Sequence, residues 1–149
     1  MGRLIDKYEG TLEHFAGDGI MVFFNDPRPQ NNHMELAVRL SLEVQKRVGQ
    51  IRPEWHKKGY NLDVGIGLTT GFATLGILGF EGRLEYGVIG NVPNLAARLS
   101  GEAQGGQIVI DGKTYSRIDN LVEVTSLGEL SLKGFSRRIP AYNILSLSA

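Results

Sequence analysis

Apolar residues recur with two different spacings in the first half of the chain. Two short runs of β-forming residues, Thr11–Phe15 and Ile20–Phe24, flank a Gly-Asp-Gly sequence, which is typical of a hairpin turn. Within Ala37–Trp55, apolar residues then lie three or four positions apart, as on one face of a helix. We expect Pro53 to break or kink this helix. The first half therefore predicts a hairpin and a long amphipathic helix.

The second half alternates strands with short helices. The segment 62–79 is rich in β-formers and glycine and predicts two strands that turn near Thr70. A strand at 84–89 precedes a helix that Asn91 and Pro93 open and that runs to about Glu102, because asparagine caps helices and proline is tolerated in the first turn. The remaining predictions are strands at 107–110, 121–125, 127–132 and 141–145 and a short helix at 112–118. This order predicts an α+β fold with a mixed, largely antiparallel sheet and helices packed on it.

Composition narrows the class of protein. A chain of 149 residues can bury one core but is too short for two domains. Its 16 Lys and Arg balance 16 Asp and Glu, which leaves no surplus charge for nucleic acid or an anionic membrane, and no apolar run approaches the roughly 20 residues of a membrane span. The absence of cysteine excludes disulfides, thiolate zinc sites and a cysteine nucleophile. We expect one cytoplasmic domain over residues 1–149, without nucleic-acid or membrane contact.

Common nucleotide and metal patterns are absent from the sequence. The glycines at Gly65–Gly71 are spaced one residue too long for GxGxxG, and no GxxxxGK[ST] occurs. His14, His33 and His56 have no metal-ligand spacing. Glycine is nevertheless abundant, at 20 residues, so we expect glycines to mark turns or to line a site.

Two segments carry candidate chemistry. Asp18 lies at the tip of the predicted hairpin, where a carboxylate can also simply accept local backbone N–H bonds. Asn94 and Arg98 lie one turn apart on the predicted helix after Asn91. Taken alone, that helix also fits a capped amphipathic helix with Leu99 in the core and Arg98 in solvent. Neither segment alone decides between a structural and a functional role.

Taken together and in chain order, the motifs resemble the catalytic domain of the bacterial-type class III adenylate/guanylate cyclases. The resemblance covers almost the whole chain, and several ordered motifs make it specific. It implies a ferredoxin-like, βαββαβ-derived fold that here lacks its first strand. The motifs lie at Gly10–Asp18, Gly65–Gly71, Glu85–Leu99, Gly106–Ile110 and Leu132–Gly134.

The resemblance implies a reaction and its cofactors. Class III cyclases convert a nucleoside triphosphate into its 3′,5′-cyclic monophosphate and pyrophosphate, by attack of the ribose 3′-hydroxyl on the α-phosphorus. Two divalent cations, Mg²⁺ or Mn²⁺, bridge two aspartates and activate the hydroxyl and hold the phosphates. Asp18 corresponds to the second of these aspartates. We expect a cyclase with ATP as substrate in preference to GTP.

The resemblance also implies roles for five other residues. Arg98 corresponds to the arginine that stabilises charge on the α-phosphate, and Asn94 to the asparagine that orients the ribose. Lys133 corresponds to the lysine that contacts the terminal phosphates. His14 and Gly87 occupy the two positions that read the base, where adenylate-type enzymes have Lys and Asp or Thr. These two departures leave base selectivity open.

The family's sites lie across a head-to-tail homodimer, so Asp18 of one subunit is expected to work with Asn94 and Arg98 of the other. The family's first metal aspartate lies on a strand before the first motif found here, whereas Arg3–Tyr8 reads as a helix that Gly10 ends. We therefore expect the domain to be incomplete at its N-terminus and inactive as it stands. A catalytically inactive nucleotide-binding or regulatory module is the alternative.

Overall fold

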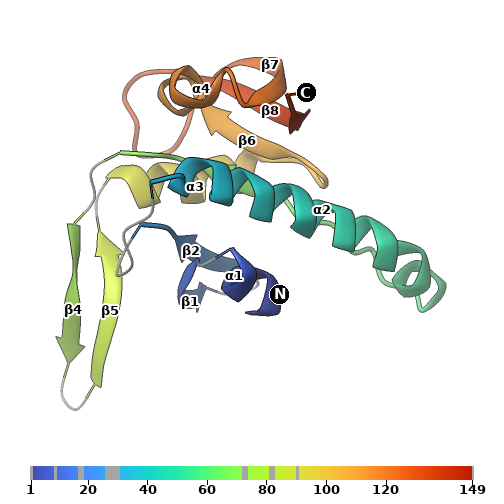
Figure 1. Ribbon diagram of the computed structural model, residues 1–149, viewed down its shortest axis with the longest axis horizontal. Helices are drawn as coiled ribbons and strands as arrows, with labels where there is room; N and C mark the ends of the chain where they lie inside the picture. The colour runs from blue at the N-terminus through green and yellow to red at the C-terminus, as the bar shows by residue number, and fades with distance from the viewer. Residues whose placement is uncertain are drawn as a thin grey trace.

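The computed structural model describes residues 2–8, 10–16, 19–25, 31–71, 74–80, 83–89 and 91–148. Its centre is a four-stranded sheet with the strand order β3-β6-β8-β7 (Figure 1). The parallel pair consists of β3 and β6, whereas β6 with β8 and β8 with β7 are antiparallel. The strands are β3 (Ile66–Leu68), β6 (Ile108–Asp111), β7 (Val122–Leu130) and β8 (Ile139–Leu147). The mixed, largely antiparallel sheet predicted from the sequence is confirmed.

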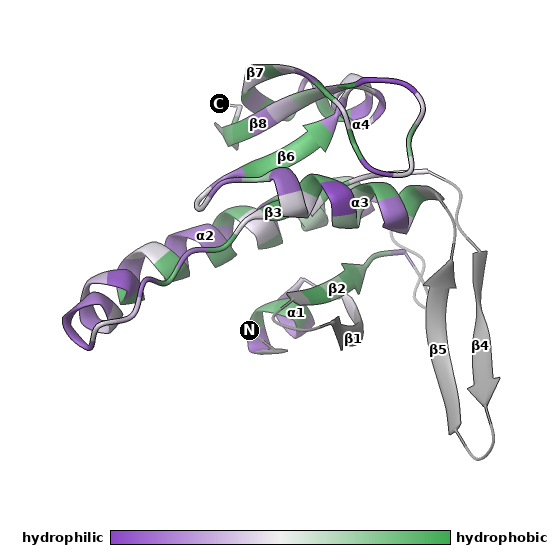
Figure 2. Ribbon diagram, turned by 180° about the vertical axis from the view of Figure 1, so that it is seen from behind, coloured by the Kyte–Doolittle hydropathy of each residue, from purple (hydrophilic) through white to green (hydrophobic). Residues whose placement is uncertain are grey.

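Strand β6 has helices on both sides. All four of its residues are buried, and Figure 2 shows most of the strand, which ends with the charged Asp111, as hydrophobic. Ile108 and Ile110 pack with Val38 of α2 (His33–Lys57) and Ile118 of α4 (Gly112–Ile118). Val109 packs instead with Leu99 of α3 (Asn91–Glu102). Because successive side chains of a strand point to opposite faces, α2 and α4 cover one face of the sheet and α3 covers the other.

Two hairpins lie beside this sheet. The first joins β1 (Thr11–Ala16) to β2 (Gly19–Phe23) and confirms the predicted N-terminal hairpin. The second joins β4 (Thr74–Phe80) to β5 (Arg83–Ile89) and extends away from the sheet (Figure 1). Both strands predicted within 62–79 exist, but they do not pair with each other: β3 pairs with β6 and β4 with β5.

Helix α2 does not end at Pro53, so a break at this proline was a wrong expectation. The helix is 25 residues long and runs to Lys57. A proline inside a helix leaves the carbonyl four residues earlier without its partner, and that residue is Gly49. Residues 49–57 are all exposed, so water can satisfy the Gly49 carbonyl. In the described ranges no helix combines the length and the apolar character needed to span a bilayer.

The structure has one strand, β7, where the sequence predicted two, at 121–125 and 127–132. Its pairing with β8 shifts register between Ser126 and Gly128, and Gly128 adopts a φ of 76°. The Gly128 N–H donates to Ser126 Oγ over 3.2 Å. A bulge of this kind interrupts the alternation of side chains without ending the strand, which is why the pattern resembled two strands.

Helix α1 (Gly2–Lys7) is held on α2 by a polar cluster. The Tyr8 hydroxyl donates to the Glu43 carboxylate, and Lys7 Nζ lies 3.3 Å from Glu43 Oε1. The hydrogen bond from Tyr8 holds the pKa of the Glu43 carboxyl below its ordinary value. The same bond raises the pKa of the Tyr8 hydroxyl. The hydrogen bond from Lys7 to Glu43 raises the pKa of the Lys7 ammonium group. The cluster favours ionised Glu43 with neutral Tyr8.

Replacing Tyr8→Phe should lower the melting temperature near neutral pH, because it removes the bond that favours ionised Glu43. A lowered folded-state pKa contributes stability above the ordinary carboxyl pKa, and this contribution is lost as pH falls through the folded-state value. The difference between the variant and the parent should therefore close in acid below the ordinary glutamate pKa of about 4.5. Thermal unfolding across this range measures it. Tyr60→Phe is the control, since Tyr60 is 61% exposed; a difference independent of pH would contradict the assignment.

Candidate active site

Helix α3 displays the two residues that the sequence singled out. Asn94 and Arg98 are both exposed, whereas Leu99 is fully buried against Val109. Residues four apart are neighbours on a helix surface. The helix predicted for this segment is confirmed, and it places an amide beside a guanidinium on its solvent side.

The backbone of α3 lies directly against β3. A Cβ added to Gly67 would lie 2.5 Å from the Ser100 nitrogen and closer still to the Ala96 carbonyl oxygen. One added to Gly65 would lie 2.8 Å from the Ala103 carbonyl oxygen. Real side chains do not tolerate such distances, so only glycine permits this approach. The glycines of the Gly65–Gly71 motif therefore seat the helix that carries Asn94 and Arg98.

Side-chain hydroxyls fix α3 on β3 at two points. Thr69 Oγ1 donates to the Val92 carbonyl over 2.7 Å, in the first turn of the helix. Ser100 Oγ donates to the Gly65 carbonyl over 3.1 Å, near the other end. Net contributions of about 1 kcal/mol are usual for such bonds, and their two positions along the helix restrict sliding and rotation.

The end of β3 is also tied to α4. The Thr70 N–H donates to Thr114 Oγ1 over 3.2 Å. The buried Asp111 caps α4 by accepting from the Thr114 N–H over 3.3 Å and from its hydroxyl. Thr114 thus links the start of α4 to the loop after β3.

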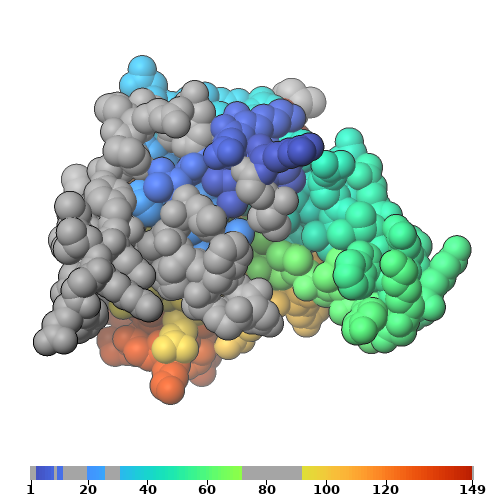
Figure 3. Space-filling view, turned by 90° about the horizontal axis from the view of Figure 1, so that it is seen from below, coloured from blue at the N-terminus to red at the C-terminus, as the bar shows by residue number. Residues whose placement is uncertain are grey.

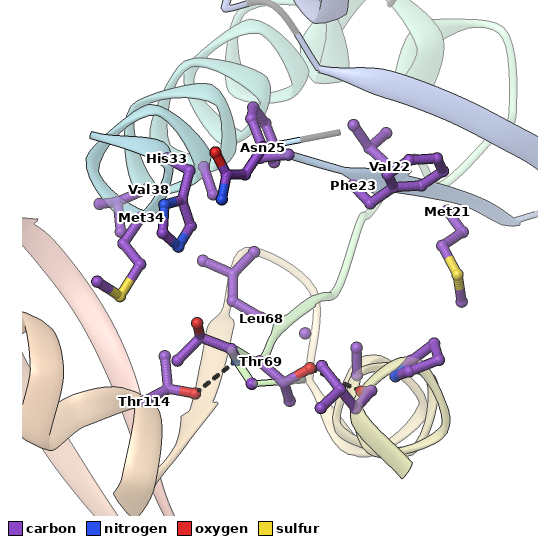
Figure 4. Close-up of a pocket in the computed structure, with 18 of the residues that line it drawn as sticks. Met21, Val22, Phe23, Asn25, His33, Met34, Val38, Leu68, Thr69 and Thr114 are labelled. Carbon is purple, nitrogen blue, oxygen red and sulfur yellow. Dashed lines mark hydrogen bonds between the residues drawn. The ribbon is translucent and has the colours of Figure 1, made fainter. Parts of the chain in front are cut away.

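A pocket of about 380 Å³ opens beside the first turn of α3 (Figure 4). Its volume lies in the range of small-molecule sites. Its walls come from β2, the start of α2, the end of β3 and the starts of α3 and α4, and its lining includes Met21, His33, Val38, Leu68, Thr69 and Thr114. Its described lining contains none of the predicted site residues. The sequence did not predict this pocket, although two of its polar lining residues, Thr69 and Thr70, follow a glycine-rich strand.

The other predicted site residues lie on different elements. Lys133 is exposed in the turn between β7 and β8, between the buried Leu132 and Gly134, whose φ is 89°. No hydrogen bond or ion pair in the described part of the chain joins Lys133 to Asn94 or Arg98. One chain therefore brings Asn94 and Arg98 together but does not link Lys133 to them.

The metal and base positions lie mostly outside the described side chains. His14 lies in β1, within its irregular register against β2, and Gly87 pairs with Gly76 in the β4/β5 hairpin. Asp18 lies outside the described residues. In the described ranges no group of three histidine or carboxylate side chains converges as a metal site would. The roles of Asp18, His14 and Gly87 stay predictions.

The chain is similar to nucleotide cyclases along almost its whole length. Residues 1–146 match the family of the adenylate and guanylate cyclase catalytic domain. Adenylate cyclase 1 of Rhizobium meliloti (strain 1021) is 26% identical over 148 residues, which are 97% of this chain and 22% of that relative. The adenylyl cyclase CyaB from P. aeruginosa has a TM-score of 0.88 at 34% identity, covering 97% of this chain and 76% of that one. The guanylyl cyclase Cya2 has a TM-score of 0.89 at 30% identity, covering 99% and 75%.

The chain belongs to the adenylate and guanylate cyclase catalytic domain family, and the resemblance seen in its motifs is confirmed. It spans 22% of the length of the rhizobial relative and 29% of a mycobacterial adenylate cyclase. The matched region is thus a minor part of each of these two relatives.

Replacing Gly67→Ala should destabilise the domain by roughly 1–3 kcal/mol, because the added methyl group forces α3 away from β3. Chemical denaturation followed by circular dichroism measures the loss. Gly101→Ala is the matched control: Gly101 lies in α3 itself, and a Cβ there meets nothing within 4 Å. Equal stability of the Gly67→Ala variant and the parent would show that α3 is not seated by this contact.

Proposed function

We propose that this domain converts a nucleoside triphosphate into its 3′,5′-cyclic monophosphate and pyrophosphate. The observation that carries the proposal is the exposed Asn94 and Arg98 pair on a rigidly seated helix, in a chain that matches the cyclase family over residues 1–146. Arg98 is to stabilise the negative charge that gathers on the α-phosphate, for which a planar and permanently charged guanidinium is suited. Asn94, one turn earlier, is to orient the ribose so that its 3′-hydroxyl faces the α-phosphorus.

Lys133 and Asp18 complete the proposed site. Lys133 is exposed next to a glycine turn, and from the resemblance we propose that its ammonium group binds the terminal phosphates. Asp18 is to hold Mg²⁺ or Mn²⁺, since hard cations prefer carboxylate oxygens. When bound, such ions supply Lewis-acid stabilisation of the phosphates and lower the pKa of the attacking hydroxyl.

We propose ATP rather than GTP as the substrate. The names of the first relatives, adenylate cyclases of Rhizobium meliloti and Mycobacterium, support this choice. The similarity to the guanylyl cyclase Cya2 makes a direct comparison of the two nucleotides necessary. A cytoplasmic setting, where both nucleotides are available, is part of the proposal.

The inactive module is the second candidate, and Gly87 favours it. Glycine at a position where the family reads the base has no side chain to bond a purine, and His14 differs from the Lys that adenylate-type enzymes have at the other position. Such a domain would keep the fold and bind nucleotide without turnover. Product formation from ATP and GTP, each with Mg²⁺ and with Mn²⁺, separates the two candidates.

We also propose that residues 1–149 alone do not turn over nucleotide, because the resemblance places the first metal aspartate outside the motifs found in them. The comparison is made between the 149 residues and the natural polypeptide that carries the domain. Product from the natural polypeptide alone supports both proposals. Full turnover by the 149 residues contradicts the second, and no product from either supports the inactive module.

In the active polypeptide, Arg98→Ala should lower kcat by about 10²–10³ and leave the fold unchanged, because an exposed side chain that acts only in the transition state is removed. Chromatographic measurement of the cyclic product gives kcat and KM. Arg117→Ala is the matched control, since Arg117 is an exposed arginine at the end of α4. An equal effect of both substitutions would indicate a general charge effect and contradict the role of Arg98.

We propose a head-to-tail homodimer in which Asp18 of one subunit faces Asn94 and Arg98 of the other. The exposed position of Asn94 and Arg98 leaves both side chains accessible to a second subunit. Asp18→Ala and Arg98→Ala subunits should each be inactive alone. An equal mixture should recover about a quarter of the parent activity, because half of the dimers are mixed and each holds one intact site. No recovery after verified subunit exchange would contradict this arrangement.

A further inference from the structure

The far end of α2 projects beyond the rest of the molecule (Figures 1 and 3). Val44 and Val48 are buried against the body of the domain, but residues 49–61 are all exposed. The apolar face of the helix nevertheless continues beyond Val48, where the body of the domain no longer covers it. Ile51 is 42% exposed and Trp55 is 41% exposed, and both continue the helical spacing of Val44 and Val48. Ile51 and Trp55 therefore form an apolar surface that no other element in the described part of the chain covers.

The aromatic residues at this end are held in a fixed arrangement. The rings of Trp55 and Tyr60 meet edge to face, with centroids 5.7 Å apart. The Tyr60 N–H donates to the Trp55 carbonyl over 3.0 Å, and Gly59, with a φ of 87°, closes the helix. Lys58 Nζ lies 5.7 Å from the centre of the Trp55 ring. A surface fixed in this way loses little conformational entropy when a partner binds.

Positive charge is concentrated around these rings. Residues 46–63 hold five Lys and Arg against one glutamate and one aspartate, so their net charge is +3. The rest of the chain holds eleven Lys and Arg against fourteen Asp and Glu, a net charge of −3. Three of the five cations act on carboxylates: Arg52 lies 3.2 Å from Asp63, Lys58 lies 4.0 Å from Glu54, and the charge of Arg47 helps to lower the pKa of Glu43. A neutral chain thus presents one strongly basic end.

A concave site lies beside the rings. A pocket of about 340 Å³ is lined by α2 and by the loop that follows it, including Arg52, His56, Tyr60, Leu62 and Asp63, whose carboxylate is paired with Arg52. Its volume is sufficient for one or two side chains of a partner. A bilayer surface contacts convex, spread aromatic and apolar groups. A pocket rimmed by tyrosine and arginine, with a tryptophan ring packed on that tyrosine, is typical of protein interfaces instead.

We propose that residues 51–63 form a docking site for an acidic helix or loop of another protein or domain. One apolar side chain of the partner enters the pocket between Arg52 and Tyr60, and its carboxylates face Lys57, Lys58 and Arg52. Trp55 packs on the apolar stripe of the partner. This site is independent of the proposed cyclase chemistry, because it shares no residue with Asn94, Arg98 or Lys133.

Binding can be followed through Trp55, the one tryptophan of the chain. The probe is an 18-residue amphipathic helical peptide with a leucine stripe flanked by glutamates. Saturable blue-shifted Trp55 emission that weakens with added salt is expected. The matched peptide with lysine in place of glutamate should give no shift. Equal responses to both peptides, or none to either, would overturn the proposal, and so would a shift produced only by phosphatidylglycerol vesicles, which would indicate a lipid surface instead.

Two variants locate the site. Lys57→Glu with Lys58→Glu should weaken binding of the acidic peptide by about tenfold or more. Arg137→Glu with Arg138→Glu is the matched control, because these neighbours are also exposed and basic but lie in the loop between β7 and β8. Trp55→Ala, tested by anisotropy of a labelled peptide, should also weaken binding about tenfold while the circular dichroism spectrum is unchanged. Equal losses for the two charge reversals would show nonspecific attraction and contradict the site.

Discussion

The backbone of α3 lies against the backbone of β3, and this close approach determines where the helix can place its side chains. Gly65 and Gly67 make the contact possible because neither has a Cβ to meet Ala96, Ser100 or Ala103. Once the helix is seated, burial of Leu99 on the sheet side fixes its rotation. Asn94 and Arg98 then face outward as a direct result.

The hydroxyl groups of Thr69, Ser100 and Thr114 make this seating specific. Apolar burial alone would tolerate small shifts of a helix along its groove, since it has no preferred direction. Bonds to defined carbonyls at both ends of α3, and from the loop after β3 to α4, do not tolerate such shifts. A helix that must present an amide and a guanidinium to a reacting phosphate benefits from this precision.

Local patterns in the sequence were sufficient for those parts of the fold that local physics determines. The Gly-Asp-Gly hairpin, the spacing within α2 and the start of α3 all follow from residues close in sequence. The pairing of β3 with β6, about 40 residues later in the chain, has no local signal. The break expected at Pro53 did not occur, because water can satisfy the exposed Gly49 carbonyl that the proline leaves without a partner. For the site, the four-residue spacing of Asn94 and Arg98 predicted their common face. The pocket beside the first turn of α3 had no such signal, because residues of distant elements, such as His33 and Thr114, line it.

Gly67 in β3 and Gly65 just before the strand also have an entropic consequence. Glycine loses more backbone freedom on folding than any other residue, roughly 0.5–1 kcal/mol relative to alanine in a strand. Strand β3 has only three residues, so the entropy lost by one glycine is a large part of its small intrinsic stability. Its stability must come from its neighbours, through its pairing with β6 and the packing of Ile66 and Leu68 against the core cluster that includes Val38. Precise placement of the α3 side chains is therefore obtained at the expense of the intrinsic stability of the strand beneath them.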